Sequence, residues 1–156
     1  MTNADCHSCR QNNQPLAELP SRDRIFDNGL WRVAHAIGSA LPGWMVVIAR
    51  RHVRSLSELT ASESATLGPL LASLSRVLEQ ELGARKAYVA FFAEAEGFAH
   101  LHLHIIPRLD SLADDHQGPR IFHYLDQPPD GWVSPTAMDQ IADRLRTLLA
   151  EQLPNL

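Results

Sequence analysis

The sequence predicts an α+β fold, in which an antiparallel sheet of about five strands packs against one long central helix and a C-terminal helix. Three observations lead to this prediction. Asn28–Gly29 joins two short segments of alternating polarity, which is typical of an antiparallel hairpin. A leucine-rich segment after Thr60 has the three- and four-residue spacing of a helix. Residues 100–106 alternate histidine with leucine or isoleucine, which is the two-residue period of a strand.

The size and composition of the chain are those of one globular domain. With 156 residues, of which 45% are hydrophobic and 21% charged, the chain is long enough to bury a core, and we expect residues 1–156 to form a single domain. The net charge is −4 and there is no long basic run, which argues against a nucleic-acid partner. No apolar run has the length of a membrane span and the first residues are polar, so we expect no membrane partner and a cytoplasmic location.

The first 23 residues are predicted to be irregular, because they are polar and contain Pro15 and Pro20. This segment holds the only two cysteines, Cys6 and Cys9. A Cys-x-x-Cys turn presents two thiolates in one direction and is the usual half of a zinc site. A redox pair and a chance occurrence remain open, since two further ligands are needed before the spacing becomes specific.

Three strands are predicted next. Residues 24–27 and 30–35 flank the Asn-Gly turn, and the apolar run 44–49 follows a Pro-Gly turn; we interpret this run as a central strand. His52 comes directly after it, at a strand exit, where functional side chains often lie. An exposed loop residue is the plain alternative for His52.

The longest predicted helix begins at Thr60 and ends at Gly83. Thr60 and Glu63 have the spacing of a capping box, and Gly83 is a typical stop. Pro69 lies inside the pattern and is expected to kink the first turns. The apolar stripe, which we interpret as core, comprises Leu67, Leu70, Leu71, Leu74, Val77, Leu78 and Leu82.

The histidine-rich segment is predicted to be a strand paired with residues 87–93. The short connection 94–97 between the two favours an antiparallel pair. Side chains two apart share one face of a strand, so His100, His102 and His104 are expected on one face. Each imidazole has two polar nitrogens that require partners when buried. Packing alone is therefore a poor explanation for three histidines on one face of a strand. Such a row can line a site for an anion or a metal.

Beyond Arg108 the periodicity is lost over a long loop. Within it the apolar patch 120–125 is open to three interpretations: a lid, an interface segment or surface packing. A last helix is predicted with Ser134 as its cap and Pro135 at its first position. Its apolar stripe comprises Met138, Ile141, Leu145, Leu148 and Leu149.

The run His100-Leu-His102-Leu-His104-Ile-Ile-Pro-Arg108 resembles the motif of the histidine triad (HIT) family. The order of predicted elements is also similar over residues 6–108, with 109–156 as a variable C-terminal extension. The resemblance implies a HIT-like fold, a homodimer, and a nucleotide hydrolase or nucleotidyl transferase. Such enzymes act at the α-phosphorus of substrates such as dinucleoside polyphosphates or nucleoside phosphoramidates.

The resemblance also implies roles for two histidines. His102 would be the nucleophile that forms a nucleotidyl-histidine intermediate. His104 would donate to a phosphate oxygen and stabilise the transition state. Two other interpretations remain: a non-catalytic module that binds a nucleotide or a partner protein, and a catalytic metal held by the three histidines themselves.

The same resemblance implies two further metal ligands for the Cys pair. Some HIT proteins hold zinc with Cys-x-x-Cys, a histidine at a strand end and the first triad histidine. Here the implied ligands are Cys6, Cys9, His52 and His100. Cys₂His₂ completes a tetrahedral shell, so this zinc would be structural. His7 is the rival for the fourth position.

Two segments depart from the better-known HIT branches. The loop before the triad, Glu94–Ala99, is short and acidic, and lacks the Asn and Gly-Gln residues that bind phosphate there. Residues 35–39 carry no carboxylate where many members bind ribose hydroxyls. The departures concern the substrate and the rate, whereas the triad itself is intact.

Overall fold

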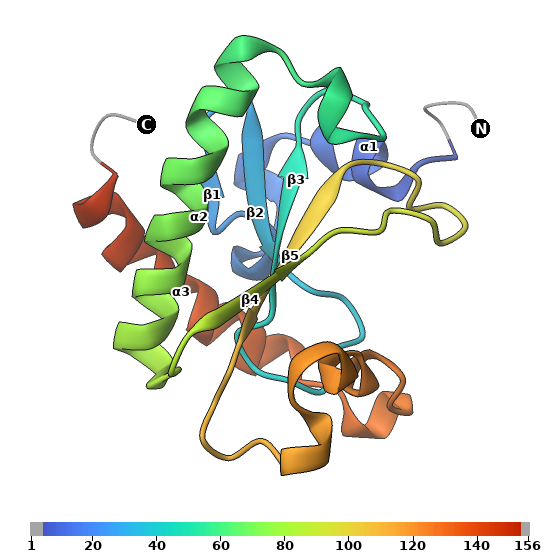
Figure 1. Cartoon of the computed structure of the whole chain (residues 1–156). Coiled ribbons are helices and arrows are strands. Elements are labelled where there is room, and N and C mark those ends of the chain that lie inside the picture. Colours follow the sequence, from blue (N-terminus) through green and yellow to red (C-terminus); the bar gives the residue numbers. More distant parts are fainter. Residues whose placement is uncertain (1–4, 154–156) are drawn as a thin grey trace.

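The structure is a computed structural model that describes residues 5–153. Its five strands form one sheet in the order β1-β2-β3-β5-β4, with every neighbouring pair antiparallel (Figure 1). The predicted α+β class is therefore confirmed. The strands are β1 Phe26–Asp27, β2 Trp31–His35, β3 Met45–Ala49, β4 Ala87–Ala90 and β5 His102–Pro107. The α-helices are α1 His7–Asn12, α2 Ala61–Leu82 and α3 Pro135–Gln152.

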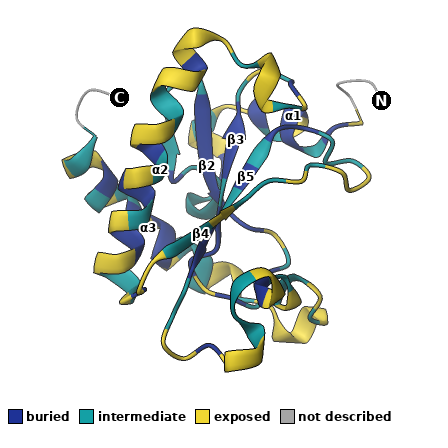
Figure 2. Cartoon of the chain, viewed as in Figure 1, coloured by how far each residue is buried: buried dark blue, intermediate teal, exposed yellow. Residues whose placement is uncertain are grey.

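One face of the sheet packs against α2 and α3. Alternate residues of the central strands point to this side, among them Val47 of β3 and Leu103 of β5. The predicted stripes of both helices supply the opposing side chains, such as Leu74 of α2 and Leu145 of α3, which are fully buried. Figure 2 shows the result as buried central strands with exposed outer helix faces.

The other face of the sheet is covered only in part. A smaller core of Trp44, Ile106 and Ile121 lies there, beneath the segment that follows β5. The α1 helix covers a second part of the same face, and Asn12 at its end donates to the carbonyl of Ala49 in β3 at 2.9 Å. An open cavity lies between these two covers, so the surface that carries the triad stays accessible.

The prediction that residues 1–23 are irregular is wrong for the part that the structure describes; residues 1–4 lie outside it. Cys6 caps α1, since its Sγ accepts from the backbone N of Cys9. Two short 3₁₀ helices follow, and each begins directly after a proline, Pro15 or Pro20. Each proline is the N-cap residue and lies just outside its helix, in an extended conformation that its fixed φ allows. A helix of six residues is too short to give a detectable period.

Two strand boundaries also differ from the prediction. β5 begins at His102, because the backbone bends at His100, whose N–H bonds the carbonyl of Phe98 at 2.7 Å. β4 ends at Ala90, the residue paired with His104. Beyond it the chain turns away, with Ala93 in the left-handed region at φ 54°.

The two long helices follow their predicted caps. Thr60 and Glu63 form the capping box of α2, and Gly83 ends it with φ 64°. Pro69 lies within α2, which is continuous across it. Ser134 caps α3 and Pro135 occupies its first turn. Of the helices within residues 5–153, none is long and apolar enough to cross a membrane.

The segment between β5 and α3 is less irregular than predicted. It contains three 3₁₀ helices, and the apolar patch 120–125 lies in the one spanning Gly118–Leu125. Ile121 is buried in the smaller core, and the Phe122 ring stands edge-on to His104 at 5.7 Å between centroids. The patch is thus packed onto the sheet, with one aromatic ring reaching the triad.

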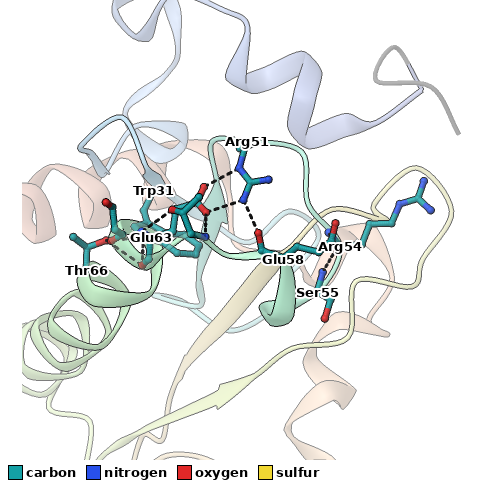
Figure 3. Close-up of polar contacts among 9 residues, drawn as sticks. Trp31, Arg51, Arg54, Ser55, Glu58, Glu63 and Thr66 are labelled. Carbon is teal, nitrogen blue, oxygen red and sulfur yellow. Dashed lines mark hydrogen bonds and ion pairs between the residues drawn. The ribbon is translucent and has the colours of Figure 1, made fainter.

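A buried carboxylate joins the start of α2 to the segment that follows β3 (Figure 3). Glu63 is 3% exposed, and its two oxygens accept from Arg51 Nε at 3.2 Å and Nη2 at 2.8 Å. The same carboxylate accepts from the backbone N of Thr60 at 2.7 Å. Hydrogen bonding from Arg51 is the main cause that lowers the pKa of Glu63 to about 2.

We expect Glu63→Gln to lower the free energy of unfolding by about 1–3 kcal/mol at pH 7, because it removes charge-assisted hydrogen bonds from a buried site. The folded-state pKa lies below the ordinary value of 4.5. The carboxylate therefore stabilises the fold above that value and loses its contribution as the pH falls toward 2. Urea unfolding at pH 7 and pH 2.5 measures this difference. The exposed Glu79→Gln is the control, and an equal loss at both pH values contradicts the assignment.

Candidate active site and metal centre

The three triad histidines do not share one environment. His102 and His104 lie in β5 and are half-buried, whereas His100 precedes the strand and is fully buried. The bend at His100 directs its ring toward the N-terminal cysteines, while the other two rings are 5.1 Å apart and line the open cavity. The geometry therefore divides the triad into one residue at the cysteines and two at the cavity.

Four side chains meet at the predicted metal position. The Cys9 Sγ lies 3.1 Å from His52 Nδ1 and 3.5 Å from His100 Nδ1, and the Cys6 Sγ lies 3.4 Å from His100 Nδ1. All four ligand atoms lie within 4.8 Å of one another. Tetrahedral zinc, with Zn–S of about 2.3 Å and Zn–N of about 2.0 Å, separates its ligands by about 3.5 Å. The cluster has the dimensions and the donor set of such a site.

The protonation chemistry of the cluster also suits a cation. The Nε2 of His100 lies 2.7 Å from the carbonyl of Ala49, and a carbonyl only accepts, so the proton is on Nε2 and the lone pair of Nδ1 faces the sulfurs. Burial and a hydrogen bond with Cys6 raise the pKa of the Cys9 thiol to about 11. A metal ion lowers such values by compensating the thiolate charge.

His7, the rival ligand, is not part of the four-residue cluster. Its ring packs on Phe98 with 5.0 Å between centroids and lines the cavity instead. The helical turn of α1 explains the division, because neighbouring residues project from different sides of a helix. The same short helix therefore presents Cys9 to the cluster and His7 to the cavity.

His102 is oriented by the backbone. Its Nδ1 lies 2.7 Å from the carbonyl of His100, so Nδ1 carries the proton and Nε2 keeps its lone pair. Burial lowers the pKa of His102, which favours the neutral ring. A neutral, oriented imidazole that lines a cavity is what a nucleophile at phosphorus requires.

His104 has the opposite tautomer. The indole Nε1 of Trp44 donates to its Nδ1 at 3.0 Å, so the proton of the neutral ring is on Nε2. Burial, with a smaller contribution from His102, lowers the pKa of His104 to about 4. At neutral pH the ring is an uncharged donor beside the lone pair of His102. The catalytic metal site of three histidines is disfavoured, because no metal-ligand cluster within residues 5–153 includes His102 or His104.

The cavity has a volume of about 390 Å³, which is within the range of small-molecule sites. Its floor is the sheet. Strand register places Arg32 beside Ile48, and Ile48 beside His102, so the three form one row across β2, β3 and β5. Two strand spacings separate Arg32 from His102 by about 10 Å. The apolar part of the wall includes Ala34, Ala36, Ile37, Val46, Ile48 and Phe98.

Sequence reasoning missed the polar end of the cavity. Arg32 is 2% exposed, and its guanidinium donates to Asn12 Oδ1 at 2.9 Å and to the carbonyl of Asp23 at 2.7 Å. Burial lowers its pKa, yet an arginine stays protonated at neutral pH, which places a cation in the cavity floor. Gln11 and Asp23 line the same end. Residues 35–39 supply no carboxylate, but Asp23 of the N-terminal segment lines the cavity.

The acidic loop before the triad reaches the site in part. Glu94 lines the cavity, and both Glu94 and Glu96 are exposed. His116 and His123, in the segment beyond Arg108, stack on each other with 4.1 Å between centroids and do not line the cavity. From that segment Phe122 and Leu125 reach the cavity.

Solved structures with the same fold include several histidine triad proteins. A zinc-bound histidine triad family protein from Mycobacterium smegmatis is 19% identical, covers 96% of each chain and has a TM-score of 0.65. A histidine triad protein from Bradyrhizobium japonicum is 25% identical over 80% of this chain and 87% of that chain, with a TM-score of 0.64. The diadenosine triphosphate hydrolase of Plasmodium falciparum, in complex with cyclomarin A, is 15% identical over 85% and 80%, with a TM-score of 0.63.

The comparison of sequences gives two results. No curated protein matches the chain. Residues 18–111, which are more than half of the chain and include β1 to β5, match the sequence pattern of the HIT domain. Together with the triad at His100, His102 and His104, this match shows that the chain belongs to the HIT domain family.

Proposed function

We propose that this protein is a nucleotide hydrolase or nucleotidyl transferase that acts at the α-phosphorus through a nucleotidyl-histidine at His102. The observation that carries the proposal is the pair of opposite tautomers. His102 offers the lone pair of Nε2, and His104 offers an N–H, in the same cavity. The Arg32 cation in the floor favours an anionic substrate.

The reaction is a double displacement. The Nε2 of His102 attacks the α-phosphorus, an N–P bond forms, and the bond from phosphorus to the leaving group breaks with its electron pair. The N–H of His104 donates to a phosphate oxygen and stabilises the charge that develops there. Water or another acceptor then attacks phosphorus, breaks the N–P bond and releases the nucleoside monophosphate with His102 restored.

A quenched reaction tests the mechanism directly. The protein is mixed with diadenosine polyphosphate or with adenosine 5′-phosphoramidate, and the release of adenosine monophosphate is followed. Base quenching preserves a histidine phosphoramidate, so mass spectrometry of peptides is expected to find adenylate on His102. Turnover without any adduct on His102 contradicts the proposal. Binding without turnover supports the alternative, a nucleotide-binding module, which the exposed carboxylate of Glu94 at the cavity favours.

We also propose that Cys6, Cys9, His52 and His100 hold one structural zinc. Four protein ligands leave no open position, so the ion fastens α1 and the residues after β3 to the start of the triad strand and takes no part in turnover. The support for zinc is the ligand geometry and the donor set. The Mycobacterium smegmatis protein with the same fold is described as zinc-bound.

A homodimer is the assembly we propose, as the family resemblance implies. β4 is an edge strand, paired only with β5 within the part of the chain that the structure describes. Val89 of β4 is 49% exposed and Phe92, just beyond it, is 58% exposed. Sedimentation equilibrium is expected to give twice the chain mass, and Val89→Glu is expected to shift the equilibrium to monomer. A wild-type monomer at micromolar concentration contradicts this assembly.

The carboxylate of Glu94 is expected to weaken substrate binding by repulsion. Glu94→Gln should lower KM for a polyphosphate substrate about two- to fivefold at low ionic strength and leave kcat unchanged, because an exposed charge acts through a screened field. The gain should disappear at high salt. Glu96→Gln is the matched control, since Glu96 is exposed and does not line the cavity. Equal effects of the two substitutions contradict a local role for Glu94.

A further inference from the structure

Phe122 is the side chain through which the segment after β5 meets the triad. Its ring stands edge-on to three others, with centroids 5.2 Å from Phe92, 5.4 Å from Trp44 and 5.7 Å from His104. Edge-to-face contacts at these distances are favourable. One side chain from outside the sheet therefore contacts both members of the hydrogen bond from Trp44 to His104.

The backbone around Phe122 is tied to the sheet on two sides. The 3₁₀ helix that carries Phe122 begins at Gly118, whose N–H donates to the hydroxyl of Tyr88 in β4 at 3.2 Å. Near its other end, the carbonyl of Tyr124 accepts from the N–H of Ala40 at 2.8 Å. Ala40 lies between β2 and β3. The segment thus spans from β4 to the connection between β2 and β3, and Phe122 is held over the triad between these two anchors.

The hydrogen bond beneath Phe122 determines how His104 can act. The indole Nε1 of Trp44 donates to Nδ1 of His104, so the bond exists only while Nδ1 carries no proton. Trp44 is 0% exposed, whereas His104 is partly buried and lines the cavity. Water that reached the His104 side of this bond would solvate a charged ring and compete for the indole N–H.

The surroundings of His104 are apolar. Burial is the main cause that lowers its pKa to about 4, and His102 beside it makes a smaller contribution. The uncharged residues around it are Val46 and Ala90 on the paired strands and the rings of Trp44 and Phe122. The other charged or titratable groups that line the cavity are His7, Asp23, Arg32, His35 and Glu94.

We propose that Phe122 is a positioning residue, which excludes water from the hydrogen bond between Trp44 and His104 and so keeps His104 a neutral donor at Nε2. The phenyl ring has no proton to give, so it acts on the reaction only through His104. The role in turnover rests on the proposed function, whereas the effect on the state of the His104 ring does not.

The first test follows the His104 ring by NMR of protein labelled with ¹⁵N in histidine, and a His104→Gln sample assigns its signals. In wild type we expect the proton on Nε2 and a pKa near 4. Phe122→Ala should raise this pKa to above about 5 and mix the two tautomers, because water then reaches the ring. Phe122→Gln keeps the volume without the apolar surface and should do the same, so it decides the question if Phe122→Ala does not fold. Phe122→Leu keeps an apolar cover and should resemble wild type.

Phe92→Ala is the matched control. Phe92 also lines the cavity and is 58% exposed. Within residues 5–153 its ring contacts that of Phe122, and neither His104 nor Trp44. The pKa and the tautomer of His104 should therefore stay as in wild type. The positioning role is overturned if Phe92→Ala or Phe122→Leu shifts the pKa of His104 as much as Phe122→Gln does, or if Phe122→Gln leaves it unchanged.

The pH dependence of turnover connects the ring to the reaction, since kcat/KM reports ionisations of the free enzyme. Protonation at Nδ1 breaks the bond with Trp44, so Phe122→Gln should lower kcat/KM about three- to tenfold relative to wild type at pH 5 and little at pH 8. His102 titrates in both proteins, so the ratio at each pH isolates His104. A loss that is equal at both pH values is that of a merely structural residue and contradicts the role in turnover. If wild type has no turnover, the catalytic proposal fails and the NMR titration still decides the role of Phe122.

Discussion

His102→Ala is expected to lower kcat for nucleotide cleavage by about 10⁴-fold or more, because it removes the group that forms the covalent bond. Adduct formation should vanish with it. The affinity for adenosine monophosphate should change by no more than a few fold, since the Arg32 cation and the apolar wall are untouched. Single-turnover kinetics with mass spectrometry measures the rate and the adduct on one sample.

Two further variants distinguish a nucleophile from a binding residue. His102→Gly opens a space at the cavity, so added imidazole is expected to restore part of the activity by replacing the lost ring. His104→Ala should cost about 10²–10³-fold in kcat, the usual effect of losing one donor to a developing charge, while the adduct on His102 still forms. A His102→Ala variant with more than a hundredth of the wild-type kcat rules out the assigned mechanism.

Loss of the metal cluster is the second large effect that we expect. His52→Ala should purify without zinc, whereas wild type should contain about one zinc per chain. The melting temperature should fall by more than about 10 °C, because the binding energy of a structural metal contributes directly to the stability of the fold. Prolonged chelation of wild type should converge on the same melting temperature. Metal analysis and calorimetry measure both quantities.

His7→Ala is the control for the metal prediction, since its ring packs on Phe98 and lies outside the cluster. It should retain zinc and most of the stability. If His7→Ala loses the metal and His52→Ala keeps it, the ligand set is wrong. If wild type prepared without chelator holds no zinc, the structural-zinc proposal fails as a whole.

Local sequence patterns predict the ends of the long helices well, because one or two nearby residues determine the backbone conformation at each end. The capping box of Thr60 and Glu63, the αL glycine at Gly83 and the Ser134 cap each mark a helix end correctly. These interactions span three or four residues and need no knowledge of the fold. The helix α1 was missed because it has only six residues, and it is held by contacts such as the hydrogen bond from Asn12 to the carbonyl of Ala49.

The residues of the candidate site also differ in whether the sequence alone reveals them. The motif at His100, His102 and His104 is contiguous and therefore visible in the sequence. Gln11 and Arg32 join it only through the sheet order that places β3 between β2 and β5 and through the packing of α1 on that sheet. The equivalence of the three histidines, suggested by their spacing, does not hold, because the backbone bends at His100 before the strand begins.

The hydrogen bonds that orient the triad differ in how they constrain sequence change. His100 and His102 are oriented by the carbonyls of Ala49 and His100, which every amino acid supplies. At His104 the tautomer depends instead on a side-chain donor, the indole of Trp44. Relatives can therefore diverge widely around the first two histidines without disturbing their tautomers. A change at Trp44 must be matched by another donor if His104 is to keep its proton on Nε2.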